Sequence, residues 1–316
     1  MTRHPPGPAG PRPRDGGVGP QAIGGFRAVG SGGLPPGRRS VPPGQYWFAI
    51  GVCAALTAYN NVFGLHPWHS RWYLRFNAGA TGVAVAAAAL SGLTAADLGL
   101  GRGRWLPGRL GSGLAAGAGA GWLLIAAVPA TRPVLGDKRA AGLDRRDTAY
   151  QALIRIPVGT ALWEEVAFRG VLQAALRRVM PGTAAIVVTS GVFGIWHIRP
   201  TLQALRVNGL AQDRPRAVAR TCAAVAGTAA AGALLSWLRD RSGSLAAPVL
   251  LHAVTNSGAL LAAQMVAGGR SPGPAGARGA VPPGQHFRRR GVDGRGRVPG
   301  QRRTPRRPPP PGSRAG

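Results

Sequence analysis

Seven apolar runs, separated by short polar or basic segments, dominate the middle of this 316-residue chain. Most are close to the roughly 20 residues that a helix needs to cross a bilayer, and several are rich in Ala and Gly, which let membrane helices pack closely. The runs cover residues 45–64, 78–96, 110–130, 149–175, 183–198, 217–238 and 244–267. This pattern predicts an all-α, polytopic transmembrane helix bundle of about seven spans, with eight within the error of the count.

The two ends of the chain differ from this apolar middle. Residues 1–44 and 268–316 consist mainly of Gly, Pro and Arg, and they hold too little apolar surface to offset the entropy that folding would cost. We therefore expect disordered tails on either side of a transmembrane domain at 45–267.

The net charge of +29 adds a basic character but does not change this class. Clustered arginines could neutralise nucleic-acid phosphates, but here they lack interleaved aromatic residues and a folded binding motif. They flank the apolar runs instead, which is typical of membrane-proximal segments, so we expect lipid contact and no nucleic-acid partner. Abundant Ala, Gly and Pro, and a single lysine (Lys138) among many arginines, favour a GC-rich bacterial source and hence a multi-pass protein of the bacterial plasma membrane.

Three charged residues interrupt the fourth run, within LWEEVAFRG at 162–170. An ionised side chain inside a membrane costs at least about 2.5 to 3.5 kcal/mol, so such residues usually have a partner or a function. On a helix, Glu165 and Arg169 share one face and can pair, whereas Glu164 points elsewhere and is free to meet another helix. A purely structural ion pair with a spare carboxylate is the alternative interpretation.

Two later segments supply polar side chains with the same spacing. SGVFGIWHI places Phe193 and His197 four positions apart, and PVLLHAVTNSG places His252 and Asn256 four positions apart inside the last apolar run. Histidine and asparagine side chains are costly to leave unpaired in hydrocarbon, so we expect them to have partners.

Together these groups could perform hydrolysis. A glutamate can take a proton from water, a histidine can hold that water, and a His/Asn pair can donate hydrogen bonds to the oxyanion of a tetrahedral intermediate. A second option is a divalent metal such as zinc, held by Glu164, His197 and His252, which would lower the pKa of a bound water. The zinc signature HExxH is absent, so the residues alone leave both mechanisms open.

The order and helical context of the three segments resemble a known family. EEVAFR is similar to the EExxxR motif, FGIWH to FxxxH and HAVTN to HxxxN of the CPBP intramembrane proteases, which include type II CAAX prenyl endopeptidases and bacteriocin self-immunity proteins. The resemblance covers about 149–267, the motif core.

The resemblance implies a role for each matching residue. Glu164 would be the general base, His197 would help to hold the water, His252 and Asn256 would stabilise the oxyanion, and Glu165, Arg169 and Phe193 would be supporting residues. It also implies an endopeptidase that acts on a membrane-associated peptide or protein.

A non-catalytic function uses the same residues differently. Intramembrane polar groups could line a transport path or bind a partner in a bacteriocin self-immunity scaffold. A transporter of inverted repeats would show two similar halves, whereas the polar residues here gather after residue 160, which favours hydrolysis.

Overall fold

The computed structural model describes residues 1, 41–65, 69, 71–101 and 106–268. Every helix described belongs to the compact unit that begins at Val41. The predicted disordered tails lie outside the described residues except at their inner ends. There, the first helix begins at Pro43 and the last extends to Gly268.

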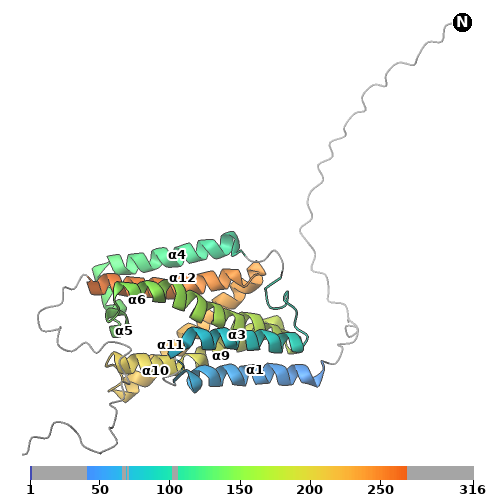
Figure 1. The fold of residues 1–316 in the computed structure, drawn as a ribbon, viewed down its shortest axis with the longest axis horizontal. Coiled ribbons are helices and arrows are strands. Elements are labelled where there is room, and N and C mark those ends of the chain that lie inside the picture. Colours follow the sequence, from blue (N-terminus) through green and yellow to red (C-terminus); the bar gives the residue numbers. More distant parts are fainter. Residues whose placement is uncertain (2–40, 66–68, 70, 102–105, 269–316) are drawn as a thin grey trace, which may run out of the picture. The chain divides into compact units, whose positions relative to one another are not determined.

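The described part of the chain is all-helical and contains no strand, which confirms the predicted class (Figure 1). The longer helices are α1 (Pro43–Asn61), α3 (Tyr73–Leu90), α4 (Gly108–Ala127), α9 (Gly182–Trp196), α10 (Ile198–Val207), α11 (Arg214–Ser242) and α12 (Ala246–Gly268). The short elements η1 (Phe63–Leu65), η2 (Pro129–Leu135) and α5 (Lys138–Ala141) lie in the connections.

Three helices of the described part are long and apolar enough to cross a membrane: α4, α11 and α12. They coincide with the predicted spans 110–130, 217–238 and 244–267. The count of about seven spans is not confirmed and stays a prediction. The other four runs do form helices, but α9 has only 15 residues and the stretch that includes 149–175 carries several charges.

Two helices end earlier than their apolar runs suggest. The run 78–96 is helical only to Leu90, because Ser91 and Gly92 turn the chain and Gly92 adopts a φ of 84°, which glycine tolerates. The run 110–130 is helical only to Ala127, and the next residue, Val128, is extended because it precedes a proline.

The fourth run forms the motif stretch, one continuous helical stretch from Arg145 to Val179. It consists of α6 (Arg145–Tyr150), η3 (Gln151–Leu162), α7 (Trp163–Glu165), η4 (Val166–Leu172) and α8 (Gln173–Val179). The segments η3 and η4 are π-helical, with hydrogen bonds between residues five apart. Pro157 within η3 has no N–H to donate, and wide turns of this kind occur often at functional sites.

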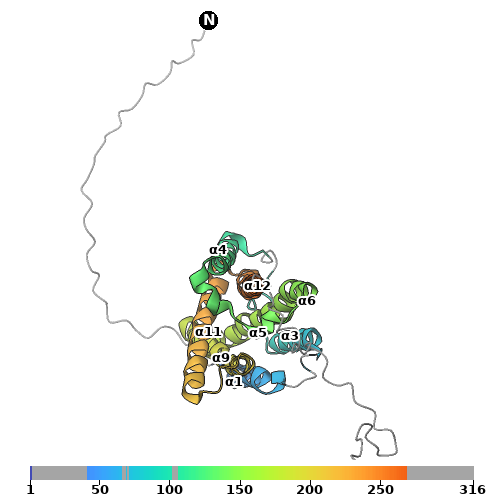
Figure 2. The same ribbon diagram turned by 90° about the vertical axis from the view of Figure 1, so that its left-hand side faces the viewer.

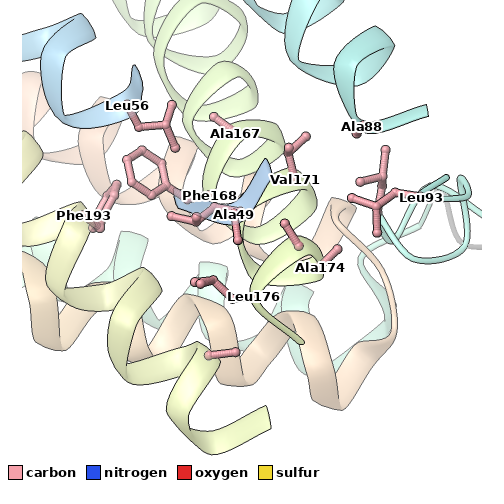
Figure 3. Packing of buried hydrophobic residues seen from close by; sticks show 14 of the residues in the cluster. Ala49, Leu56, Ala88, Leu93, Ala167, Phe168, Val171, Ala174, Leu176 and Phe193 are labelled. Atoms are coloured by element: carbon pink, nitrogen blue, oxygen red, sulfur yellow. The ribbon is translucent and has the colours of Figure 1, made fainter. Parts of the chain in front are cut away.

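The motif stretch lies at the centre of the packing. Helix α12 runs beside α4 and also packs against η3, while α9 packs along α11 (Figures 1 and 2). Figure 3 shows Ala167, Phe168 and Val171 of the motif stretch in one buried cluster with Leu56 of α1 and Phe193 of α9. The charged residues of the same stretch therefore lie on an element that packs against α1, α3 and α9.

The contact between α4 and α12 depends on a glycine. A Cβ built on Gly111 would lie 2.8 Å from the Cβ of Ala247, which is fully buried, whereas one built on Gly113 would meet nothing within 4 Å. Small residues therefore set how closely these two apolar helices approach.

We expect the Gly111→Ala variant to lose about 1 to 3 kcal/mol of stability, because the added methyl group forces the two helices apart. Thermal unfolding of the full chain in detergent measures this as a lower Tm. The matched control Gly113→Ala adds the same methyl group to open space and should keep or raise the Tm, since alanine favours a helix by up to about 1 kcal/mol over glycine. Equal Tm values for the two variants would contradict the close contact.

Candidate active site

The predicted ion pair of the motif stretch is present and fully buried. Arg169 Nη1 donates to Glu165 Oε1 at 2.9 Å, and both side chains have zero exposure. Arg169 also donates through Nη2 to the Gly232 carbonyl at 3.3 Å, and its guanidinium carbon lies 4.2 Å from the centroid of the Phe193 ring. The ion pair expected from the helical spacing is therefore present, and its supporting role in catalysis stays a prediction.

Glu165 has a second partner that the helical spacing did not predict. His252 Nδ1 lies 2.7 Å from the same oxygen, Glu165 Oε1. An ionised carboxylate only accepts hydrogen bonds, so Nδ1 carries the proton and donates it. Glu165 therefore joins Arg169 of its own helix to His252 of α12, and orients the imidazole ring.

Glu164 projects toward two other helices, as expected. Its Oε1 accepts a hydrogen bond from Trp196 Nε1 of α9 at 3.3 Å. Its Oε2 lies 3.9 Å from His252 Nε2 and is buried without a hydrogen-bond partner among the residues that the structure describes. A buried carboxylate oxygen that faces the second nitrogen of an oriented histidine is a strong candidate for chemistry.

His197 and Phe193 occupy the end of α9. His197 Nδ1 lies 2.7 Å from the Phe193 carbonyl oxygen, a contact in which the nitrogen donates, and the two rings are in edge contact at 4.7 Å between centroids. The Phe193 ring also stands edge-on to His252, with centroids 6.1 Å apart. Phe193 thus contacts both histidines, and His197 Nε2 forms no hydrogen bond with the residues that the structure describes.

Asn256 lies one turn beyond His252 on α12 but faces different surroundings. It is partly exposed and lines a cavity of about 450 Å³ that Gln151 and Arg155 also line. Within the described ranges, its side chain makes no hydrogen bond. The two residues of the predicted pair therefore have different surroundings: His252 contacts the buried glutamates, and Asn256 lines an open cavity.

The alternative metal ligand set is not assembled. Nowhere in the described part of the chain do three or more His, Cys, Asp or Glu side chains gather closely enough to hold a metal ion. Of the proposed ligands, Glu164 and His252 lie together, with 3.9 Å between Oε2 and Nε2. Glu164, His197 and His252 do not fit a metal centre in this geometry.

Trp196 and a second layer of polar residues around it were missed by the sequence analysis. Tyr59 of α1 stacks its ring on that of Trp196, with centroids 5.7 Å apart, and Asn60 Nδ2 donates to the Trp196 carbonyl at 3.0 Å. The Tyr59 hydroxyl donates to Asn77 Oδ1 at 2.8 Å, and Asn77 Nδ2 donates to the Gly159 carbonyl at 2.6 Å.

One signal could have found this layer. The triplet YNN at 59–61 and Asn77 are polar groups at the ends of apolar runs, where unpaired amides are costly. Their partners are on distant helices, so spacing along the chain does not identify them.

Comparison with known proteins gives one match. The family model described as "Type II CAAX prenyl endopeptidase Rce1-like" matches residues 147–258, a range that includes the two glutamates, both histidines and Asn256. No curated protein and no solved structure matches the chain. This part of the chain is therefore similar to the type II CAAX prenyl endopeptidase Rce1-like family, in agreement with the intramembrane-protease family that the three motifs resemble.

Proposed function

We propose that this chain is an intramembrane endopeptidase that hydrolyses peptide bonds of a membrane-associated protein or peptide. The observation that carries the proposal is the buried Oε2 of Glu164, which has no hydrogen-bond partner among the described residues and lies 3.9 Å from His252 Nε2. Two atoms at this separation can share one water at ordinary hydrogen-bond distances of about 2.8 Å.

Glu164 is the general base in this proposal. Its Oε2 takes a proton from the water as the water oxygen attacks the carbonyl carbon of the scissile peptide bond. The resulting tetrahedral intermediate carries a negative charge on the former carbonyl oxygen. When the C–N bond breaks, Glu164 returns the proton to the leaving nitrogen, so the products are a carboxylic acid and an amine.

Glu165 and Arg169 are positioning residues. The bond from His252 Nδ1 to Glu165 Oε1 directs Nε2 toward Glu164, and Arg169 compensates the buried charge of Glu165. Without this pair, the histidine would lose both its orientation and its fixed proton.

The remaining residues act on the water and the oxyanion. His197 helps to hold the water through Nε2, because its Nδ1 is used by the Phe193 carbonyl. Asn256 donates its amide to the oxyanion from the cavity side. His252 acts as an imidazolium, whose Nε2–H is hydrogen-bonded to the water before attack and to the oxyanion after it. Since the possible metal ligands do not gather, no step is assigned to a metal.

We place this activity in the bacterial plasma membrane, in a multi-pass protein in contact with lipid. The three apolar helices α4, α11 and α12 support a membrane location. The substrate is a membrane-associated peptide or protein, because the glutamates lie on a helical stretch that packs against one of these helices.

The first test is the Glu164→Gln variant. It preserves size but removes the base, so cleavage of a reporter peptide library should fall by about 10² or more. The Tm in detergent should change little, because the amide can still accept the bond from Trp196. Full activity in this variant would overturn the assignment of the base. A well-folded wild-type sample that cleaves no peptide would instead favour a binding or transport function.

Glu165→Gln should behave differently from its neighbour. It leaves Arg169 buried without its carboxylate and weakens the hold on His252, so stability should drop by about 3 to 5 kcal/mol along with activity. Comparison of the Tm values of the two glutamine variants measures this difference. The roles are reversed if Glu164→Gln is the less stable protein.

Metal analysis of purified, active full chain separates the two mechanisms. We expect no stoichiometric zinc and no loss of turnover with a chelator, because Glu164 and His252 hold the water directly in this proposal. His252→Ala should lose turnover without a change in metal content. Stoichiometric zinc that disappears in His252→Ala would establish the metal mechanism instead.

A further inference from the structure

The cavity beside Asn256 has a polar wall and an apolar wall. Its volume is about 450 Å³, and it lies between the connection that includes α5, the start of η3 and the second half of α12. Gln151, Arg155 and Asn256 supply polar groups, while Trp122 and Leu260 supply apolar surface. Such a mixture suits an apolar chain that carries one or two charged or polar groups.

Two of the charges in this cavity cancel one another. Arg139 donates to both oxygens of Asp137, at distances of 2.6 to 3.1 Å, and Asn208 adds a bond at 3.3 Å. Partial burial alone would raise the pKa of Asp137, but these bonds and the nearby guanidinium outweigh it and hold the pKa below its ordinary value. Asp137 therefore stays ionised and neutralises Arg139.

Arg155 is different, because it forms no ion pair with any carboxylate in the described ranges of the chain. Its Nη1 donates to Gln151 Oε1 at 3.0 Å, and its guanidinium carbon lies 4.2 Å from the centroid of the Tyr73 ring. It is only partly exposed and belongs to a run predicted to lie in the membrane. A positive charge held in place in a cavity without a carboxylate partner is a site for an anion.

The cavity is connected to the proposed reaction centre by two residues. Asn256 lies one turn from His252, which contacts both glutamates. Tyr73 stacks on Arg155 and contacts the motif stretch at Thr160, four residues before Glu164. The Tyr73 hydroxyl is hydrogen-bonded to Thr160 Oγ1 at 2.9 Å. The Tyr73 ring packs against Gly159 so closely that a Cβ at that position would lie 3.0 Å from the ring.

We infer that Arg155, assisted by Gln151, binds a carboxylate of the peptide substrate and so determines specificity. Gln151 Oε1 accepts from Arg155, which leaves the Gln151 amide nitrogen to donate to the same anion. A peptide carboxylate fits better than a lipid headgroup, because the cavity includes Asn256, which lies one turn from His252 on α12. The carboxylate is either the C-terminus or an acidic side chain. The inference rests on the proposed function for the identity of the ligand.

The test uses full-length Glu164→Gln in zwitterionic nanodiscs, so that binding is measured without turnover. The probes are labelled apolar peptides in matched forms: free acid or amide at the C-terminus, and Glu or Gln at one internal position. We expect one of the two carboxylates to improve affinity about tenfold or more, and the pair that responds identifies its source. Equal binding of all forms, or no binding, would overturn the inference.

Variants at Arg155 and Arg139 assign the effect. Adding Arg155→Gln should reduce the carboxylate preference to about one, whereas Arg155→Lys should keep part of it through the retained charge. The matched control Asp137→Asn/Arg139→Gln removes a neutral ion pair from the same cavity and leaves Arg155 in place, so the preference should survive. A preference that persists in Arg155→Gln, or that Arg155→Gln and the double variant lose equally, contradicts a specific role for Arg155. A specific role for Arg155 is also contradicted if Arg155→Gln weakens binding to anionic lipid nanodiscs but leaves the peptide affinities unchanged.

The same probes with active wild type separate this inference from the proposed function. Cleavage of acid and amide forms at equal rates would support the endopeptidase activity and contradict the carboxylate site. Arg155-dependent binding without any cleavage would support the carboxylate site and contradict the endopeptidase activity.

Discussion

The shared oxygen of Glu165 is the interaction on which the rest of the site depends. Oε1 accepts from Arg169 of its own helix and from His252 of α12, and all three side chains are buried. A buried ionised carboxylate is tolerated only with close, hydrogen-bonded partners of opposite charge. Because Glu165 needs both hydrogen bonds, it fixes the distance and rotation of α12 relative to the motif stretch. The same constraint sets the position of the His252 ring that faces Glu164.

Much of this site could be predicted from the sequence, because it depends on local spacing. Glu165 and Arg169 are four residues apart on one helical stretch, and the pair forms even though the adjoining turns are π-helical. The same spacing also indicated that Glu164 points away from this pair and is free to meet another helix. Local geometry was sufficient for both inferences.

The parts that could not be predicted depend on contacts between distant segments. Nothing in the spacing of His252 and Asn256 says that the first is buried against Glu165 while the second lines a cavity. The same holds for Trp196, which resembles an ordinary core aromatic until its Nε1 is seen to donate to Glu164. Helix ends were misjudged where a glycine or a proline stops an apolar run, as at Gly92 and Val128, because hydropathy does not register backbone conformation.

Helix α12 carries both parts of the proposed chemistry, the histidine beside the glutamates and the asparagine in the cavity, one turn apart. His252 faces the glutamates, Asn256 faces the cavity, and one helical turn advances only about 5.4 Å along the axis. A carbonyl group that receives a hydrogen bond from Asn256 while its carbon is attacked by a water on Glu164 must therefore lie across this turn. The peptide would approach from the cavity, where Arg155 supplies a positive charge. The close packing of α4 on α12 at Gly111 matters for the same reason, since a shift of α12 would move His252 and Asn256 together.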